Sequence, residues 1–193
     1  MKTVDLQGAL ELLKEGKTLI FPTETSYALG CDATNDTAVE RVVKIKGRPN
    51  GKGTPFLLPS QMDPEEFVDF SPKLSALAER FWPGPFNIVA PRSKSSTASA
   101  RCETDGTQAV RKSSHPVAAE LASKLGQPIV ATSANRADRP SIYTAAGIRE
   151  EFKDGELPDG FLDVGDLPIT PVSTIVKKEN GEVMIVRQGG IVL

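Results

Sequence analysis

A strand, a polar turn and a helix follow one another within residues 18–52, and this succession constrains the fold more than any other feature of the sequence. Residues 18–21 predict a short buried strand, and the turn after it carries hydroxyls and one carboxylate: Thr23, Glu24, Thr25 and Ser26. Asp36 is typical of a helix N-cap, because its side chain can accept hydrogen bonds from the free amides of the first turn. We expect this helix to end near Gly47. Three cations crowd that end of the helix: Lys46, Arg48 and Lys52.

The rest of the chain continues the alternation of helices and strands. Helices are predicted at residues 6–13, from 63 or 64, at 72–81, at 116–125 and near 144–152, and strands at 55–58, 86–90, 108–111 and 129–131. Residues 172–177 and 183–187 predict a hairpin with Asn180 and Gly181 in its turn. We therefore expect an α/β fold, with a single domain over residues 1–193 built on one twisted mixed sheet with flanking helices. The polar segment 93–99 is expected to be mobile.

The composition limits the classes of function. The 193 residues suffice for one well-buried domain and are few for two. The 23 basic and 25 acidic residues nearly cancel, so an anion site has to be a local cluster of charge. Two cysteines do not make a disulfide framework, no segment approaches the ~20 apolar residues of a membrane span, and charges interrupt the N-terminal segment, unlike a signal peptide. We expect a cytoplasmic protein with no membrane segment.

The residue types available exclude several kinds of chemistry. His115 is the only histidine, which excludes histidine-rich metal sites and disfavours a Ser-His-Asp triad. Residues 47–52 are one residue short of a Walker loop and lack the hydroxyl that should follow its lysine. We predict neither a protein-held metal nor a phosphate loop of that type.

Two further arginines change the interpretation of the cations at residues 46–52. Alone, those cations could serve only to offset the helix dipole. Arg111 and Arg187, however, each end a predicted strand, and α/β sheets bind ligands at strand ends. Convergent cations of this kind suit a triphosphate and a carboxylate, since charge-assisted hydrogen bonds to such groups are strong.

Five motifs follow one another along the chain: Pro-Thr-Glu-Thr at 22–25, Lys-Gly-Arg-Pro at 46–49, Trp-Pro-Gly-Pro at 82–85, Ser-Ala-Asn at 133–135 and Ser-Thr-Ile-Val at 173–176. Any one of them could be a simple turn or cap. In this order and spacing they resemble the threonylcarbamoyl-AMP synthase family, of the TsaC/YrdC type. The resemblance implies a YrdC-like fold in its short, single-domain form, with a concave, positively charged face.

The resemblance also implies a reaction. Members of that family make threonylcarbamoyl-AMP and pyrophosphate from L-threonine, bicarbonate and ATP, for the threonylcarbamoyl modification of tRNA adenosine. A carbamate oxygen attacks the α-phosphate, so the protein must hold two anions together and neutralise charge rather than supply a nucleophile. Mg²⁺ with ATP is the expected cofactor. Proteins that transfer the product to tRNA are the expected partners, and weak RNA binding is left open.

Site residues are carried over motif by motif, as roles that the resemblance implies. The catalytic residues are expected to be Lys46 and Arg48. The ATP-binding residues are expected to be Arg48, Lys52, Thr107, Ser133, Asn135, Ser141 and Arg187. The threonine-binding residues are expected to be Thr25, Arg111 and Ser173, and no residue is expected to bind a metal directly.

The chain departs from the family pattern at several positions. Asn87 stands where the family often has threonine, and Leu57 replaces a histidine that meets threonine in some relatives. The proline usual after the motif that ends at Arg111 is replaced within Lys112-Ser113-Ser114, and Ala137-Asp138 replaces a common Ser-Gly. Two other functions stay open: a module that binds RNA without chemistry, and a paralogue that adenylates a different carbamate. Retention of the Lys-x-Arg and Ser-Ala-Asn motifs favours the synthase.

Overall fold

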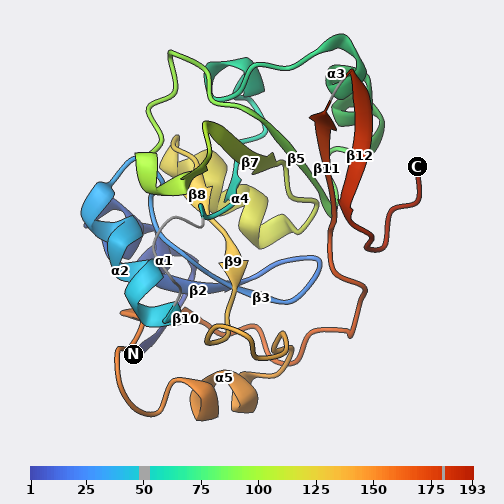
Figure 1. Cartoon of the computed structure of the whole chain (residues 1–193). Helices are drawn as coiled ribbons and strands as arrows, with labels where there is room; N and C mark the ends of the chain where they lie inside the picture. The colour runs from blue at the N-terminus through green and yellow to red at the C-terminus, as the bar shows by residue number, and fades with distance from the viewer. Residues whose placement is uncertain (48–52, 180) are drawn as a thin grey trace.

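The structure is a computed structural model that describes residues 1–47, 53–179 and 181–193, and in this part of the chain the strands form two sheets (Figure 1). The first sheet has the order β1 (Lys2–Val4), β10 (Gly160–Leu162), β2 (Leu19–Pro22), β3 (Tyr27–Gly30) and β9 (Thr132–Ser133). The second has the order β12 (Glu182–Arg187), β11 (Thr174–Glu179), β5 (Phe86–Pro91), β7 (Thr107–Arg111), β4 (Phe56–Leu57) and β8 (Ile129–Val130), with β6 (Glu103–Thr104) beside β7.

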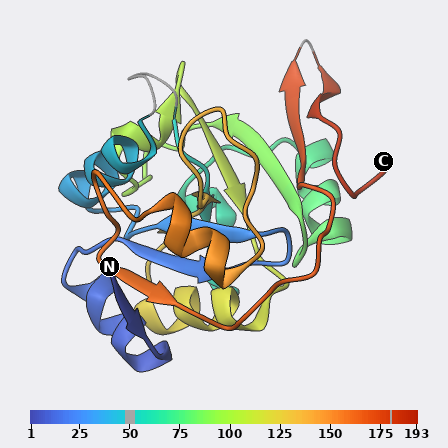
Figure 2. The ribbon, with the colours of Figure 1, turned by 90° about the horizontal axis from the view of Figure 1, so that it is seen from below.

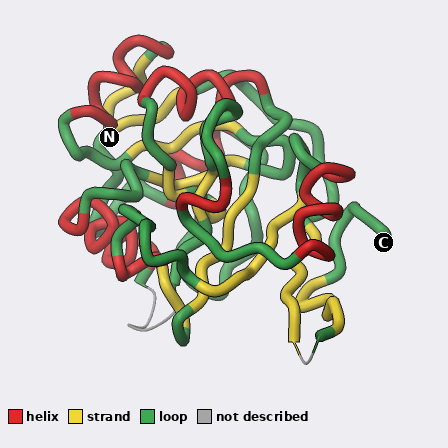
Figure 3. Tube along the Cα trace, turned by 90° about the horizontal axis from the view of Figure 1, so that it is seen from above, coloured by secondary structure: helices red, strands yellow, loops and turns green. Residues whose placement is uncertain are grey.

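The helices are α1 (Leu6–Lys14), α2 (Asp36–Lys46), α3 (Pro72–Phe81), α4 (Pro116–Leu125) and α5 (Ala145–Glu151), with 3-10 turns at Pro64–Glu66 and Ala100–Cys102. Helices α1 and α4 lie side by side on one face of the first sheet (Figure 2), where their small and aliphatic residues pack on Leu19 and Phe21. Helix α2 buries Val39, Val42 and Ile45 in a second core shared by both sheets. Figures 2 and 3 show the hairpin of β11 and β12 projecting beyond the other elements.

The two sheets approach each other closely at Gly30. A Cβ atom on this residue would lie 1.7 Å from the carbonyl oxygen of Val130, so only glycine permits the approach of β3 to β8. From Val130 the chain leaves the second sheet and enters the first as β9, where Ser133 pairs with Ala28. The turn at residues 23–26 and the loop after Ser133 thereby lie at the same edge of the molecule.

The α/β class is confirmed, and the predicted helices and the terminal hairpin are present, although residue 180 of its turn lies outside the described residues. The strands, however, divide between two sheets where one was expected. The N-cap prediction was wrong by one residue, since Asn35 and not Asp36 accepts the hydrogen bond from the amide of Ala38. The strands β1, β3, β6, β9 and β10 were not predicted.

The segment 93–99, for which mobility was predicted, makes hydrogen bonds within itself and to the rest of the fold. Arg92 Nη2 donates to the carbonyl oxygens of Ser96 and Ala98 at 2.9 and 2.7 Å. Ser95 Oγ donates to the carbonyl oxygen of Glu66, and the amide of Ser99 donates to that of Ala33. Its small polar side chains predicted a mobile segment, and in the structure the hydrogen bonds to Ala33 and Glu66 connect it to distant parts of the chain.

Candidate functional site

A cavity of about 410 Å³ opens where the ends of strands from both sheets meet. Its described wall combines hydroxyls, amides, cations and one carboxylate from seven separate stretches of chain: Thr23, Thr25, Ser26, Lys46, Asn87, Arg111, Thr132, Ser133, Asn135, Arg136, Asp138, Ser141, Ser173 and Arg187. Its volume is in the range usual for small-molecule sites. Donor groups outnumber carboxylates in this wall, which suits an anionic ligand.

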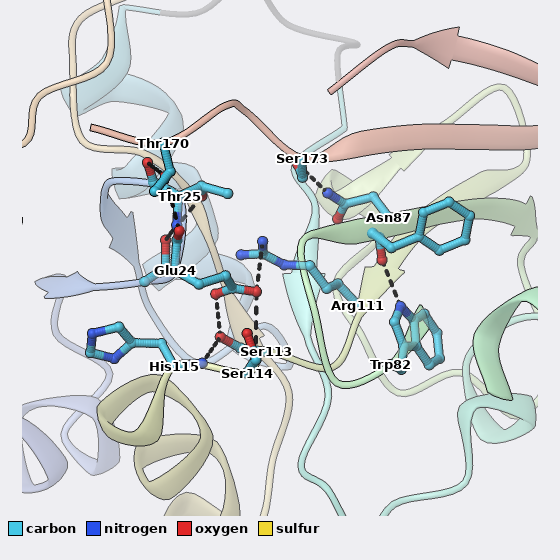
Figure 4. A network of polar contacts seen from close by, with 12 residues as sticks. Glu24, Thr25, Trp82, Asn87, Arg111, Ser113, Ser114, His115, Thr170 and Ser173 are labelled. Atoms are coloured by element: carbon cyan, nitrogen blue, oxygen red, sulfur yellow. Dashed lines mark hydrogen bonds and ion pairs between the residues drawn. The ribbon is translucent and has the colours of Figure 1, made fainter. Parts of the chain in front are cut away.

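Arg111 is the most buried cation of the cavity. It ends β7 beside Leu57 of β4, and its side chain is 6 % exposed. Its Nη1 lies 3.3 Å from Glu24 Oε1 (Figure 4), yet no hydrogen bond joins Nη1 to any described residue. Burial lowers the pKa of Arg111, the charge of Glu24 raises it, and the nearby positive charge of Arg187 lowers it. An anionic ligand beside this guanidinium would therefore offset the cost of burying its charge and the repulsion from Arg187.

Glu24 is itself fixed from several sides. Ser113 Oγ donates to its Oε2 at 2.6 Å, and the amide of Ser114 lies 3.4 Å from Oε1 (Figure 4). The hydroxyl of Thr170 donates to the backbone carbonyl oxygens of Glu24 and Thr25, which anchors the turn. The carboxylate thus balances the charge of Arg111 from a fixed position.

Ser173 lies at the start of β11 and is contacted by two donors. Arg187 donates from Nε and Nη2 to the carbonyl oxygen of Ser173 and from Nη2 to its hydroxyl, at 3.0, 2.8 and 2.8 Å. Asn87 Nδ2, from β5, donates to the same hydroxyl at 2.7 Å (Figure 4). Burial lowers the pKa of Arg187. The bulge of the β11–β12 pair near Ile175 lies beside this cluster.

The Ser133–Asn135 loop is bound to the end of helix α2 by Lys46. Lys46 Nζ donates to the carbonyl oxygens of Ser133 and Asn135 and to Asn135 Oδ1, at 2.7, 2.9 and 3.0 Å. Ser133 Oγ also donates to Asn135 Oδ1 at 2.6 Å, and Asn135 Nδ2 donates to the carbonyl oxygen of Arg139. These hydrogen bonds indicate that Lys46 stabilises the conformation of the Ser133–Asn135 loop. They lend no support to the predicted contact of Lys46 with phosphate.

Most of the residues predicted from the sequence lie in this one wall: Thr25, Lys46, Arg111, Ser133, Asn135, Ser141, Ser173 and Arg187. Arg48 and Lys52 lie outside the described residues. Thr107 does not line the cavity: it lies at the opposite end of β7 from Arg111, where its hydroxyl donates to the carbonyl oxygen of Thr104 at 2.7 Å. The predicted contact of Thr107 with ATP therefore gains no support from this geometry.

Sequence reasoning missed Arg136, and it treated Asn87 and Asp138 only as departures from a pattern. Arg136 donates from Nη1 to the carbonyl oxygen of Ile45 at 2.6 Å, so it caps the end of helix α2 while lining the cavity. Its position directly after the Ser-Ala-Asn motif was the signal available in the sequence.

Metal ligands are scarce in the described wall. Within residues 1–47, 53–179 and 181–193, no group of three or more His, Cys, Asp or Glu side chains is placed to hold a metal ion. Asp138 is the carboxylate among the described lining residues. Separately, no helix in the described ranges has the length and apolar character needed to cross a membrane.

The motifs, the fold and the cavity together correspond to a known family. The model of the Sua5, YciO and YrdC proteins, described as "Telomere recombination", matches residues 11–189. Because this match covers nearly the whole sequence, the chain belongs to the Sua5/YciO/YrdC family.

Curated relatives in this family bear the name threonylcarbamoyl-AMP synthase. One from Chromobacterium violaceum is 36% identical over 183 residues, which cover 92% of this chain and 91% of that protein. One from Pyrococcus abyssi is 35% identical over 188 residues, which cover 96% of this chain but 54% of that protein. The chain therefore spans about half the length of the P. abyssi relative.

Solved structures agree with this assignment. The crystal structure of P. abyssi Sua5 complexed with L-threonine matches with a TM-score of 0.87 at 32% identity, over 96% of this chain and 54% of that one. The crystal structure of Escherichia coli YciO matches with a TM-score of 0.83 at 21% identity, over 96% of this chain and 89% of that one, and shares the fold.

Proposed function

We propose that this chain is a nucleotidyltransferase that forms threonylcarbamoyl-AMP and pyrophosphate from L-threonine, bicarbonate and ATP. The Arg111 guanidinium supports this proposal most directly. It is buried at the cavity wall, and its Nη1 donates no hydrogen bond to any described residue. A ligand carboxylate could accept this hydrogen bond. The name of the curated relatives points to the same chemistry.

Threonine is proposed to bind between the residue 23–26 turn and β11. Arg111 would meet its carboxylate, while Thr25 and the Ser173 hydroxyl offer further hydrogen bonds from two sides of the cavity. The P. abyssi structure whose fold this chain shares was determined as a complex with L-threonine. A buried arginine suits this task, because a carboxylate can form two parallel hydrogen bonds with its planar fork.

ATP is proposed to lie along the loop that follows β9. Ser133, Asn135 and Ser141 supply hydroxyls and an amide there, and Arg187 reaches the cavity from β12. Arg48 and Lys52, which lie outside the described residues, are proposed to meet the phosphates. Lys46 acts through the loop that it holds in place.

The reaction needs positioning and charge neutralisation rather than a protein nucleophile. The amine of threonine forms a bond to the carbon of carbon dioxide and loses a proton, or reacts with bicarbonate and releases water, and either route gives a carbamate. A carbamate oxygen then forms a bond to the α-phosphorus, and the bond from that phosphorus to the leaving oxygen of pyrophosphate breaks. The mutual repulsion of Arg111 and Arg187 is relieved when two anions enter between donor groups held in advance.

Mg²⁺ is proposed to arrive with ATP. The described wall offers Asp138 and several hydroxyls, which suits an ion carried mainly by substrate phosphates and water. When bound, the ion supplies positive charge to the phosphates. The product is a reactive mixed anhydride, so we also propose a cytoplasmic role upstream of proteins that transfer the threonylcarbamoyl group to tRNA adenosine.

The test is a mass-spectrometric assay of the purified chain with ATP, Mg²⁺, L-threonine and labelled bicarbonate. We expect labelled threonylcarbamoyl-AMP that disappears when threonine is omitted. Arg111→Gln should raise the KM for threonine by at least about tenfold, as loss of a charge-assisted pair predicts. Lys112→Gln is the matched control, because this neighbouring cation donates to the carbonyl oxygen of Ser60 and does not line the cavity.

Other results would redirect the proposal. ATP binding without the labelled product would indicate a paralogue that adenylates a different carbamate. RNA binding without any ATP binding would indicate an RNA-binding module.

A further inference from the structure

The hydroxyl of Ser173 receives two hydrogen bonds from groups that can only donate. Asn87 Nδ2 lies 2.7 Å and Arg187 Nη2 lies 2.8 Å from Ser173 Oγ, and the first of these contacts is drawn in Figure 4. A serine hydroxyl has two acceptor lone pairs and one proton to donate. With both lone pairs engaged, the proton has to point in a third direction. No acceptor for it is found among the described residues.

Ser173 borders the cavity, so a ligand bound there can supply an acceptor for this proton. Ser173 is 7 % exposed and lines the cavity wall, as do Arg111 and Arg187. This part of the wall therefore presents N–H and O–H donors around one space. A ligand group that enters it must be an acceptor, and a carboxylate with two oxygens satisfies more of these donors than a neutral group can.

Asn87 is placed to orient the Ser173 hydroxyl because it lies in β5, which is paired on both sides in the second sheet. It is 7 % exposed and lies in β5 directly opposite Ile175 of β11. The indole Nε1 of Trp82 donates to the carbonyl oxygen of the preceding residue, Phe86, at 2.6 Å and anchors this end of the strand. A buried amide without a hydrogen-bond partner is costly, so its contact with Ser173 also stabilises Asn87 in this position.

We propose that Asn87 is a positioning residue of the threonine subsite, which acts with Arg187 to fix the Ser173 hydroxyl as a hydrogen-bond donor to the substrate carboxylate. This inference rests on the proposed function. Asn87 acts through Ser173, so its loss matters only while the Ser173 hydroxyl is present. The same Arg187 side chain joins this hydroxyl to the proposed nucleotide side of the cavity.

The test is a double-mutant cycle on L-threonine affinity, measured by calorimetry on the full chain saturated with a non-hydrolysable ATP analogue. We expect Asn87→Ala and Ser173→Ala each to weaken threonine binding about tenfold, the loss typical of one hydrogen bond to a charged acceptor. The double variant should bind threonine no more weakly than Ser173→Ala alone. In turnover, the KM for threonine should rise while the KM for ATP stays unchanged, which a general loss of folding would not produce.

Asn87→Asp provides an isosteric arm of the experiment. Its carboxylate can only accept, so the Ser173 proton should turn toward it and leave the cavity without this donor. Threonine affinity should fall further than in Asn87→Ala and recover as the pH is lowered toward the pKa of the introduced carboxyl. Combining Asn87→Asp with Ser173→Ala isolates the effect of the negative charge. If Asn87→Ala folds poorly, Asn87→Asp takes its place in the double-mutant cycle.

Two results would overturn the inference alone: unchanged threonine affinity in Asn87→Ala, or losses that add fully in the double variant. Failure of the unaltered chain to bind threonine would overturn the proposed function and, with it, this inference. The two failures are distinguishable because the second is seen before any substitution is made.

Discussion

Arg111 Nη1 lies 3.3 Å from Glu24 Oε1, and the two side chains are only 6 % and 14 % exposed. This contact is an ion pair without a hydrogen bond from Nη1, while Glu24 accepts its short hydrogen bond from Ser113 Oγ. The carboxylate therefore balances the charge of Arg111 and leaves donor capacity on the guanidinium. A substrate carboxylate can then bind Arg111 without first displacing a protein acceptor.

Glu24→Gln should lower the stability of the ligand-free chain by about 3 kcal/mol, because it leaves a buried guanidinium without an opposing charge. L-threonine should then raise the melting temperature of this variant more than that of the unaltered chain, since the substrate carboxylate replaces the missing charge. Thermal unfolding with and without threonine measures both effects.

Ser113→Ala is the matched control for this prediction. It removes the 2.6 Å hydrogen bond to Glu24 but keeps both charges, so a smaller loss of about 1.5 kcal/mol is expected, with an ordinary response to threonine. If Glu24→Gln were as stable as the unaltered chain, the ion pair would have no stabilising role.

Lys46→Met should reduce both stability and activity. The substitution keeps the length of the side chain but deprives Ser133 and Asn135 of the ammonium group that their oxygens contact at 2.7 to 3.0 Å. A loss of about 3 kcal/mol is expected in urea-induced unfolding, as for buried acceptors that lose a charged donor.

Lys44→Met is the control for Lys46. It removes a cation from the same last turn of α2, but Lys44 forms an exposed pair with Glu40, which contributes little. Undiminished stability of Lys46→Met, combined with lost turnover, would instead favour direct contact between Lys46 and phosphate.

The motifs that resemble the family predicted eight residues that line the cavity, but they gave no indication of Arg136 and included Thr107, which lies elsewhere. Arg111 ends a strand, and Ser133 and Ser173 occur in short polar motifs beside apolar runs. The N-cap of α2 was misplaced by one residue because Asn35 and Asp36 are both good caps, and local propensity does not choose between them.

The pairings inside the cavity could not be predicted in the same way. Asn87 meets Ser173 only because β5 and β11 are neighbours in the second sheet, and their register depends on the whole fold. The close approach of Gly30 to Val130, where the two sheets meet, joins residues far apart in the sequence, so no local pattern predicts it. The strands β1 and β10 have three residues each, too few for a periodicity to be recognised.

His115 should make stability depend on pH near neutrality. Burial lowers the pKa of its ring below the ordinary 6.5, and the charge of Glu24 only partly opposes this. The unfolded chain therefore takes up a proton at a higher pH than the folded chain, so the contribution is complete above about pH 6.5 and is lost as the pH falls through the folded pKa.

Urea-unfolding midpoints between about pH 7.5 and pH 5 test this expectation. The unaltered chain should lose stability toward the acid end, and His115→Gln should flatten the profile in that window. The sequence contains no other histidine, so an equal slope in the variant would assign the titration to another group.

Gly189→Ala should displace the backbone that carries Ser173 in the cavity wall. A Cβ atom on Gly189 would lie 2.0 Å from the carbonyl oxygen of Val172 and 2.5 Å from the carbonyl carbon of Ser173, so the backbone that carries Ser173 would have to move. The hydrogen bonds of Arg187 and Asn87 to Ser173 depend on that backbone. We expect the KM for threonine to rise by about tenfold or more, with a stability loss of about 1–3 kcal/mol.

Gly190→Ala is a closely matched control, one residue along the same segment. A Cβ atom there would come no closer than 3.4 Å, to Pro171 Cβ, so the Ser173 backbone can stay in place. Threonine KM should therefore change little in Gly190→Ala. Equal effects of the two substitutions would mean that the segment tolerates no side chain for reasons unrelated to Ser173. A selective effect of Gly189→Ala would show that close packing against the backbone of Ser173 sets the geometry of the threonine subsite.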